Sequence, residues 1–310
     1  MSSVGPAAEV DRQLPVGEEI FLDHVGHFVR DPQAASRALV RAGFAPTPVS
    51  VQVHPDPAGV PQPTGTGNVT AMLGRGYIEA LFRTADTPLG REFDAALSDY
   101  CGIHLAAFSV ADAASALDRL ATAGFPVRPL VDFQRPVTTE MGEGIAAFTV
   151  ARVERGAMAE GRIQILTHRT EGTVWQKRWL THPNGAHGLL DLVVVAADPD
   201  EAAARLSRFT GRTAERSTMG RTIRLDRGRV ELVTPNAWHM LLPAVAIPRL
   251  PFMAAYALKV ASLERARAAL AQGGVAASRQ GAAIIAAFPP ELGVGAWWLA
   301  ESADLLPWRS

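Results

Sequence analysis

The sequence predicts an α+β protein made of four copies of one β-α-β-β-β unit. Two observations predict it. An apolar strand, a polar break, a helix rich in alanine and leucine, and a glycine follow one another four times along the 310 residues. Each copy then continues with two short strand patterns that a glycine-containing turn separates, as in β-hairpins. The second strand of every unit is poorly marked.

The start of each unit has the local chemistry that its elements need. Val, Leu, Ile and Phe dominate the strands, and Asp31-Pro32 and Asp198-Pro199 are good helix starts, with Asp as N-cap and Pro in the first turn. The expected first strands are residues 21–29, 102–110, 188–196 and 252–260, and the helices after them are residues 33–42, 111–123, 200–210 and 262–271. Gly43, Gly124 and Gly211 follow three of these helices, where a left-handed C-cap is common.

The end of each unit is expected to be a hairpin. The strand pairs are residues 68–73 and 77–83, 145–153 and 162–167, 222–225 and 229–233, and 283–288 and 296–300. A proline-rich segment, residues 46–63, is expected to be a loop over the first unit. Residues 171–186 read as a connector between the second and third units.

Composition limits the classes of partner. Lys and Arg number 30 and Asp and Glu 31, so nucleic acid and membrane surfaces are not expected partners. The single cysteine, Cys101, excludes an intramolecular disulfide framework. No apolar run approaches the roughly 18 residues of a membrane span. We expect a cytoplasmic protein that acts on a small molecule, and a homodimer is compatible with the sequence.

Three motifs carry a family resemblance. The phrase Leu22-Asp-His-Val-Gly26, the Asp31-Pro32 helix and the strand Gly76-Tyr-Ile-Glu-Ala80 resemble the vicinal oxygen chelate superfamily, which includes glyoxalase I, extradiol dioxygenases and fosfomycin resistance proteins. Residues 175–179 and 181–186 look like its bacterial glyoxalase-like branch.

The resemblance implies a domain organisation. Units pair into cupped mixed sheets, so the four units would form two such domains. After an N-terminal tail at residues 1–19, the first domain would span residues 20–170, with units 20–84 and 101–169. The connector 171–186 would lead to a second, degenerate domain at residues 187–302, with units 187–235 and 252–302.

The resemblance also implies a divalent metal in the cup, held by the first and last strand of each unit. The matching positions in the first pair are His24, Glu79, His104 and Gln164. Zn, Ni, Mn and Fe are all compatible with these ligands. For a single histidine in an apolar strand, a buried core residue is the commoner role.

Further site residues follow from strand parity. Tyr77 and Arg83 share the face of Glu79, and Arg162 shares that of Gln164, so these three are candidate substrate contacts. Ordinary surface arginines are the alternative for the two arginines. Glu79 and His168 are the candidate acid–base groups, and His168 could also be an alternate ligand.

The second pair of units does not repeat the ligand set. Asp191 and Glu231 match His24 and Glu79, but the fourth unit offers Ala255 or Tyr256 and a pair of tryptophans. We therefore expect a structural or substrate-covering role for this half. The connector tryptophan Trp175 is expected either to anchor the linker or to act as a lid.

The resemblance implies three candidate functions. A chelated metal would stabilise an enediolate, giving a lyase or isomerase in which Glu79 moves a proton. An extradiol-type ring-cleavage dioxygenase is the first alternative, although its usual carboxylate position is Gln164 here. A non-catalytic binding protein of the resistance type is the second.

Overall fold

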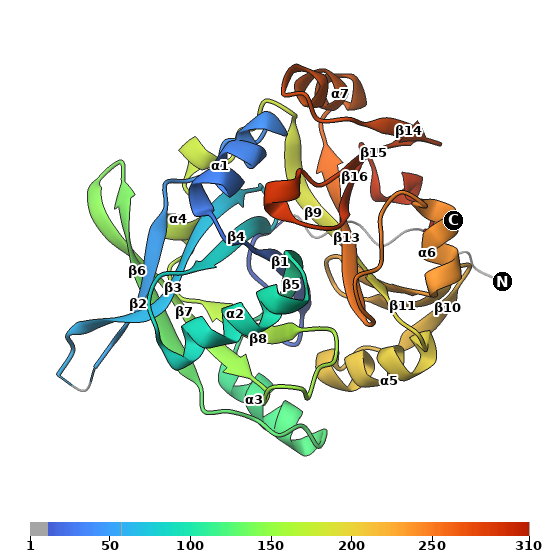
Figure 1. Cartoon of the computed structure of the whole chain (residues 1–310). Helices are drawn as coiled ribbons and strands as arrows, with labels where there is room; N and C mark the ends of the chain where they lie inside the picture. Colours follow the sequence, from blue (N-terminus) through green and yellow to red (C-terminus); the bar gives the residue numbers. More distant parts are fainter. Residues whose placement is uncertain (1–11, 57, 310) are drawn as a thin grey trace.

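The computed structural model describes residues 12–56 and 58–309, which form two eight-stranded sheets (Figure 1). The first sheet closes into a barrel with the order β1-β4-β3-β2-β6-β7-β8-β5. Its strands are β1 (Ile20–Phe28), β2 (Ser50–Pro55), β3 (Pro61–Met72), β4 (Tyr77–Arg83), β5 (Gly102–Val110), β6 (Val131–Thr139), β7 (Gly142–Arg152) and β8 (Arg162–His168). A bridge between Val53 and Gln134 joins β2 to β6 and closes it.

The second sheet is open, with the order β10-β11-β12-β9-β13-β16-β15-β14. Its strands are β9 (Ala186–Val195), β10 (Ala214–Ser217), β11 (Gly220–Arg224), β12 (Arg229–Val233), β13 (Phe252–Val260), β14 (Ser278–Gln280), β15 (Ala283–Ala287) and β16 (Ala296–Ala300). Both sheets are mixed and carry helices, so the predicted α+β fold of four paired units is confirmed. The short edge strands β10 and β14 leave this sheet unclosed.

Each unit contains one long helix after its first strand. These helices are α1 (Pro32–Arg41), α3 (Ala113–Thr122), α5 (Pro199–Thr210) and α7 (Leu263–Gln272). The Asp31 and Asp198 side chains accept hydrogen bonds from backbone N–H groups of the first turn, as predicted. Gly211 adopts φ 70°, the left-handed C-cap conformation.

Two helices, α2 (Pro88–Asp99) and α6 (Pro235–Leu241), join the units within each pair and lie outside the repeat. The connector forms α4 (Glu171–Val174) and a 3₁₀ turn, η1 (Lys177–Trp179). The predicted loop at residues 46–63 was partly wrong, because β2 and the start of β3 lie within it.

One hydrophobic core joins the two halves. Phe108 of β5 and Phe125 after α3 both contact Phe209 of α5, at ring centroid distances of 6.3 Å and 5.7 Å. The inside of the barrel has its own, smaller apolar cluster, which includes Phe28, Phe93 and Leu105. Within the described residues, no helix is long and apolar enough to cross a membrane.

Candidate active site in the barrel

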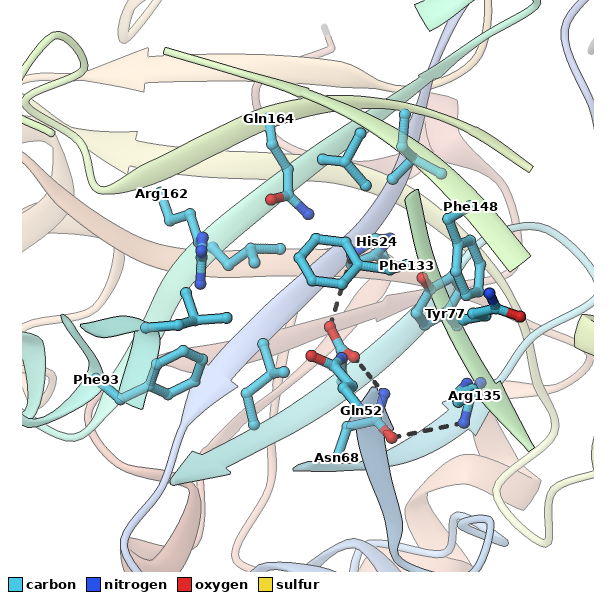
Figure 2. A pocket seen from close by; sticks show the side chains of 17 residues that line it. His24, Gln52, Asn68, Tyr77, Phe93, Phe133, Arg135, Phe148, Arg162 and Gln164 are labelled. Atoms are coloured by element: carbon cyan, nitrogen blue, oxygen red, sulfur yellow. Dashed lines mark hydrogen bonds and ion pairs between the residues drawn. The ribbon is translucent and has the colours of Figure 1, made fainter. Parts of the chain in front are cut away.

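A pocket opens inside the barrel, and side chains from all eight of its strands and from α2 line it (Figure 2). Phe93, Phe133 and Phe148 supply apolar surface. Polar groups come chiefly from two regions. Tyr77 and Arg135 lie at one side of the pocket, and Arg162 lies at the opposite side beside Phe93 (Figure 2).

A buried carboxylate, that of Asp23, lies behind the pocket and contacts two imidazoles. The pairing of β1 with β5 slips between Leu22 and His24, so Asp23 occupies a β-bulge. His24 Nδ1 lies 2.7 Å from Asp23 Oδ1, and His168 Nε2 lies 3.0 Å from Asp23 Oδ2. An ionised carboxylate only accepts hydrogen bonds, so both imidazoles donate to it.

The two imidazoles keep Asp23 ionised. Burial alone would raise the pKa of Asp23, but the nearby His168 and His24 more than offset this and hold the pKa well below its usual range. Because His24 donates through Nδ1, its Nε2 faces the pocket and is free to accept a proton when the ring is neutral.

Glu79 lies beside His24, on the neighbouring parallel strand β4. Its Oε2 lies 3.6 Å from His24 Nε2, and its Oε1 accepts a hydrogen bond from Asn68 Nδ2 at 2.5 Å. Arg135 Nη1 in turn donates to Asn68 Oδ1 at 3.5 Å. The Glu79 carboxylate is therefore held in place through one oxygen, while the other remains directed at His24.

Tyr77 positions the His24 ring. The two rings stack with centroids 4.2 Å apart and an interplanar angle of 19°. Burial, and then the carboxylates of Asp23 and Glu79, raise the pKa of Tyr77 well above its usual value, so its hydroxyl stays protonated at neutral pH. Trp175 packs edge-on against Tyr77 and His168, with ring centroid distances of 6.1 Å and 4.5 Å. The buried Trp175 thus anchors the connector beneath the site.

His104 does not reach this pocket, which corrects the predicted ligand set. Pairing of β1 with β5 slips again, from Gly26–Leu105 to His27–Ile103, and leaves His104 in a bulge. Its ring stacks on Tyr100 at 4.0 Å, in a different cavity. Burial lowers the pKa of His104 to about 4, so the ring is neutral at physiological pH.

Leu105 occupies the position in the second unit that corresponds to His24. His24 pairs with Tyr77 of β4, and Leu105 pairs in the same way with Arg162 of β8. Leu105 also lines the pocket, as His24 does. The predicted ligand His104 is therefore one position away from Leu105, the residue of this strand that faces the pocket.

The remaining donors do not fit a tightly held transition metal. Of the predicted ligands, His24, Glu79 and Gln164 line the pocket, with Leu105 in the fourth position. Gln164 offers only an amide oxygen, whereas catalytic metal sites usually have three imidazole, carboxylate or thiolate ligands. Among the described residues, no group of three or more His, Cys, Asp or Glu side chains is placed to hold a metal ion.

The other predicted residues divide between the pocket and its surroundings. Tyr77 and Arg162 line it. Arg83 points away and pairs with Asp86 at 2.8 Å and with Asp94, so its alternative role as a surface arginine holds. His168 is buried behind the pocket against Asp23, and does not itself line the cavity.

The cup of the second sheet is filled by protein. Asp191 accepts hydrogen bonds from Trp308 Nε1 at 2.8 Å and Arg309 Nε at 2.9 Å, so the C-terminal residues cover it. Trp298 and Trp308 pack there with centroids 5.0 Å apart. Burial, with a smaller contribution from Asp191, raises the pKa of Glu231 to about 7.

The sequence profile of the glyoxalase-like domain family matches residues 22–210. The chain belongs to this family. The match begins within β1 and covers the rest of the barrel together with β9 and α5, so the pocket of this glyoxalase-like protein lies in the family's domain. The search of curated proteins gives no match.

Solved structures share the fold of this glyoxalase-like protein. A hypothetical protein from Staphylococcus aureus aligns with a TM-score of 0.62 and 9% identity, over 90% of this chain and 98% of that one. A mutant 4-hydroxymandelate synthase from Streptomyces coelicolor gives 0.53 and 16%, over 92% and 94%. A fusion of a xylose isomerase-like TIM barrel with a 4-hydroxyphenylpyruvate dioxygenase gives 0.52 and 12%, over 93% and 50%. These identities establish the vicinal oxygen chelate fold alone.

Sequence reasoning missed the residues that hold His24 and Glu79 in place. Asp23 stands beside His24, and regular strand alternation would send it to the opposite face. Asn68 lies in a predicted strand, but only the pairing of β3 with β4 brings it near Glu79. Arg135 belongs to the second unit, and no local pattern connects it with Asn68.

Proposed function

We propose that the barrel of this glyoxalase-like protein moves a proton on a small substrate that carries a carbonyl group, which is chemistry of the lyase or isomerase type. The observation that carries the proposal is the facing pair of His24 and Glu79, 3.6 Å apart in a pocket lined by aromatic side chains. Two proton-transfer groups on one cavity allow one to remove a proton while the other returns it.

In this mechanism His24 is the base. Its Nε2 accepts a proton from a carbon next to the substrate carbonyl, and the buried Asp23 stabilises the imidazolium that forms. His168 is a positioning residue, since it holds the second oxygen of Asp23. Asn68 does the same for Glu79.

His24 then passes this proton to Glu79 Oε2, the oxygen that Asn68 leaves free 3.6 Å from His24 Nε2, and Glu79 delivers it to the neighbouring atom of the substrate. The amide of Gln164, on the wall of the same pocket, is placed to donate a hydrogen bond to the substrate oxygen that gains charge. A divalent metal would supply Lewis-acid chemistry in relatives that hold one, but no step here is assigned to it because the donor set lacks a second imidazole or carboxylate.

The two alternatives are less well supported by the pocket. A ring-cleavage dioxygenase needs an iron site of two histidines and one carboxylate, and Leu105 stands where the second histidine would be. The hypothesis of a non-catalytic binding protein explains the aromatic walls of the pocket. It does not explain the hydrogen bonds that hold the carboxylates of Glu79 and Asp23.

Exchange of substrate hydrogen for solvent deuterium tests the proposal. The protein is incubated in D₂O with a panel of α-hydroxyketones and α-keto acids, and loss of the α-proton signal is followed by NMR. We expect exchange of at least one compound with the wild-type protein and its loss in H24Q. Binding of panel compounds without exchange would instead favour the binding-protein alternative.

A further inference from the structure

Three arginines meet at the end of the barrel nearest α2. Arg128 lies before β6, Arg152 ends β7 and Arg162 begins β8. Arg152 pairs with Gln164 across the sheet, so its side chain lies on the inner face of the barrel. We call these three residues the guanidinium cluster.

Among the described residues, the carboxylate that pairs with the cluster is that of Glu92. Glu92 of α2 lies 3.4 Å from Arg128 and 3.7 Å from Arg162, through different oxygens. The structure gives Arg152 no ion pair within its described residues, and its buried Nε has no hydrogen-bond partner there. Its guanidinium instead lies over the Phe133 ring, 5.6 Å from the centroid.

Arg152 is partly buried close to the two other guanidiniums of the cluster. Burial, followed by Arg162 and Arg128, lowers the pKa of Arg152 to about 10. The cavity beside the cluster is lined by five arginines and three carboxylates, and Asp99 already pairs with Arg249 at 2.7 Å. The cluster therefore holds three guanidiniums against one paired carboxylate among the described residues, which leaves N–H donors available for an anionic ligand.

The cluster is continuous with the active site. Arg162 lines both the barrel pocket and the α2 cavity, and Phe133 lines the barrel pocket beneath Arg152. Figure 2 shows Arg162 on the side of the pocket away from Tyr77 and Arg135. A molecule lying along the pocket would therefore have one end at His24 and Glu79 and the other at the cluster.

We propose that the guanidinium cluster binds an oxyanion, the carboxylate or phosphate group of the substrate, and so selects an anionic small molecule. Planar guanidiniums suit both groups because each can give two parallel N–H···O hydrogen bonds. The anion site is argued from the cluster alone. The proposal rests on the proposed function only in assuming that the other end of the substrate reacts at His24.

Binding of inorganic phosphate, measured by calorimetry at low ionic strength, tests the cluster directly. We expect wild-type protein to bind one phosphate and R152Q to bind at least about tenfold more weakly, because it loses a charge-assisted bidentate contact. R224Q is the matched control, since Arg224 pairs with Glu215 on the exposed surface of the second sheet. Equal phosphate affinity in R152Q and wild type, or an equal loss in R224Q, would overturn the proposal.

Thermal unfolding separates a lost site from a lost fold. Without phosphate, R152Q should melt no lower than wild type, because repulsion within the cluster is relieved. Added phosphate should raise the melting temperature of wild type and not of R152Q. Acetate in place of phosphate identifies the preferred group, the tighter anion being the better model of the substrate. H24Q should bind phosphate as wild type does, so a failed exchange assay and a failed anion site give different results.

Discussion

Asp23 and His24 are neighbours in β1, and a bulge makes them partners in one network. Regular alternation would place them on opposite faces of the strand. The extra residue lets the Asp23 carboxylate accept from His24 on its own strand and from His168 on β8. A buried carboxylate with two donors is both a stabilising contact and the group that fixes which nitrogen of His24 faces the pocket.

Substituting Asp23→Asn should cost stability at neutral pH. The native pKa of Asp23 is depressed, so the carboxylate contributes stability above its ordinary pKa of 3.8 and loses it as the pH falls further. Removing one partner of a buried pair typically costs roughly 3–5 kcal/mol. Denaturant unfolding should show a large deficit for D23N at pH 7 that narrows below about pH 4. A deficit that does not change with pH would mean that the charge of Asp23 is not what stabilises the fold.

At the scale of elements, the sequence predicted the strands and helices of the four repeated units better than the segments that join these units. The Asp31 and Asp198 caps and the apolar first strands are local signals, and the structure bears them out. Helices α2 and α6 were not predicted, although Thr87-Pro88 and Thr234-Pro235 are N-cap signals of the same kind. The bulge at His104 could not be predicted, because it depends on how β1 pairs with β5.

The bulge at His104 places Leu105, in place of a histidine, at the pocket, and this can be tested through metal binding. Leu105→His would place an imidazole in the pocket with His24, Glu79 and Gln164, and so complete a set of donors that the native chain lacks. We expect L105H to bind about one Co²⁺ per chain, seen by visible absorption, and H104L to behave as wild type. If H104L removed a metal that wild type already binds, the assignment of His104 to the other cavity would be wrong.

At the scale of the whole molecule, the two sheets have diverged in use. The barrel keeps an open pocket, whereas the C-terminal residues fill the cup of the second sheet around Asp191. When the four units are compared in sequence, the fourth has no residues that match the expected metal ligands. The sequence therefore predicted that the second half lacks this site. The covering by Trp308 and Arg309 could not be predicted, because it depends on a contact between the chain end and β9.

Glu231 should limit stability at alkaline pH. In the structure, neither carboxylate oxygen has a hydrogen-bond partner among the described residues, and Thr222, which pairs with it on β11, does not reach hydrogen-bond geometry. Because its native pKa is raised to about 7 from 4.5, its contribution to stability is full below pH 4.5 and is lost as the pH rises through 7.

The substitution E231Q should therefore raise the free energy of unfolding by about 2–3 kcal/mol at pH 8 and leave it unchanged near pH 4. Chemical denaturation at the two pH values measures both. An equal effect at both would show that shape, and not charge, sets the role of Glu231.

Deuterium exchange in the presence of a chelator tests the central claim, that His24 and Glu79 of the barrel transfer protons without a metal. We predict that wild-type exchange of the responsive panel compound persists in EDTA, falls about 100-fold or more in H24Q, and is unchanged in E231Q, which changes a carboxylate in the cup of the second sheet. Exchange that EDTA abolishes and a divalent ion restores, or an equal loss in E231Q, would contradict the account.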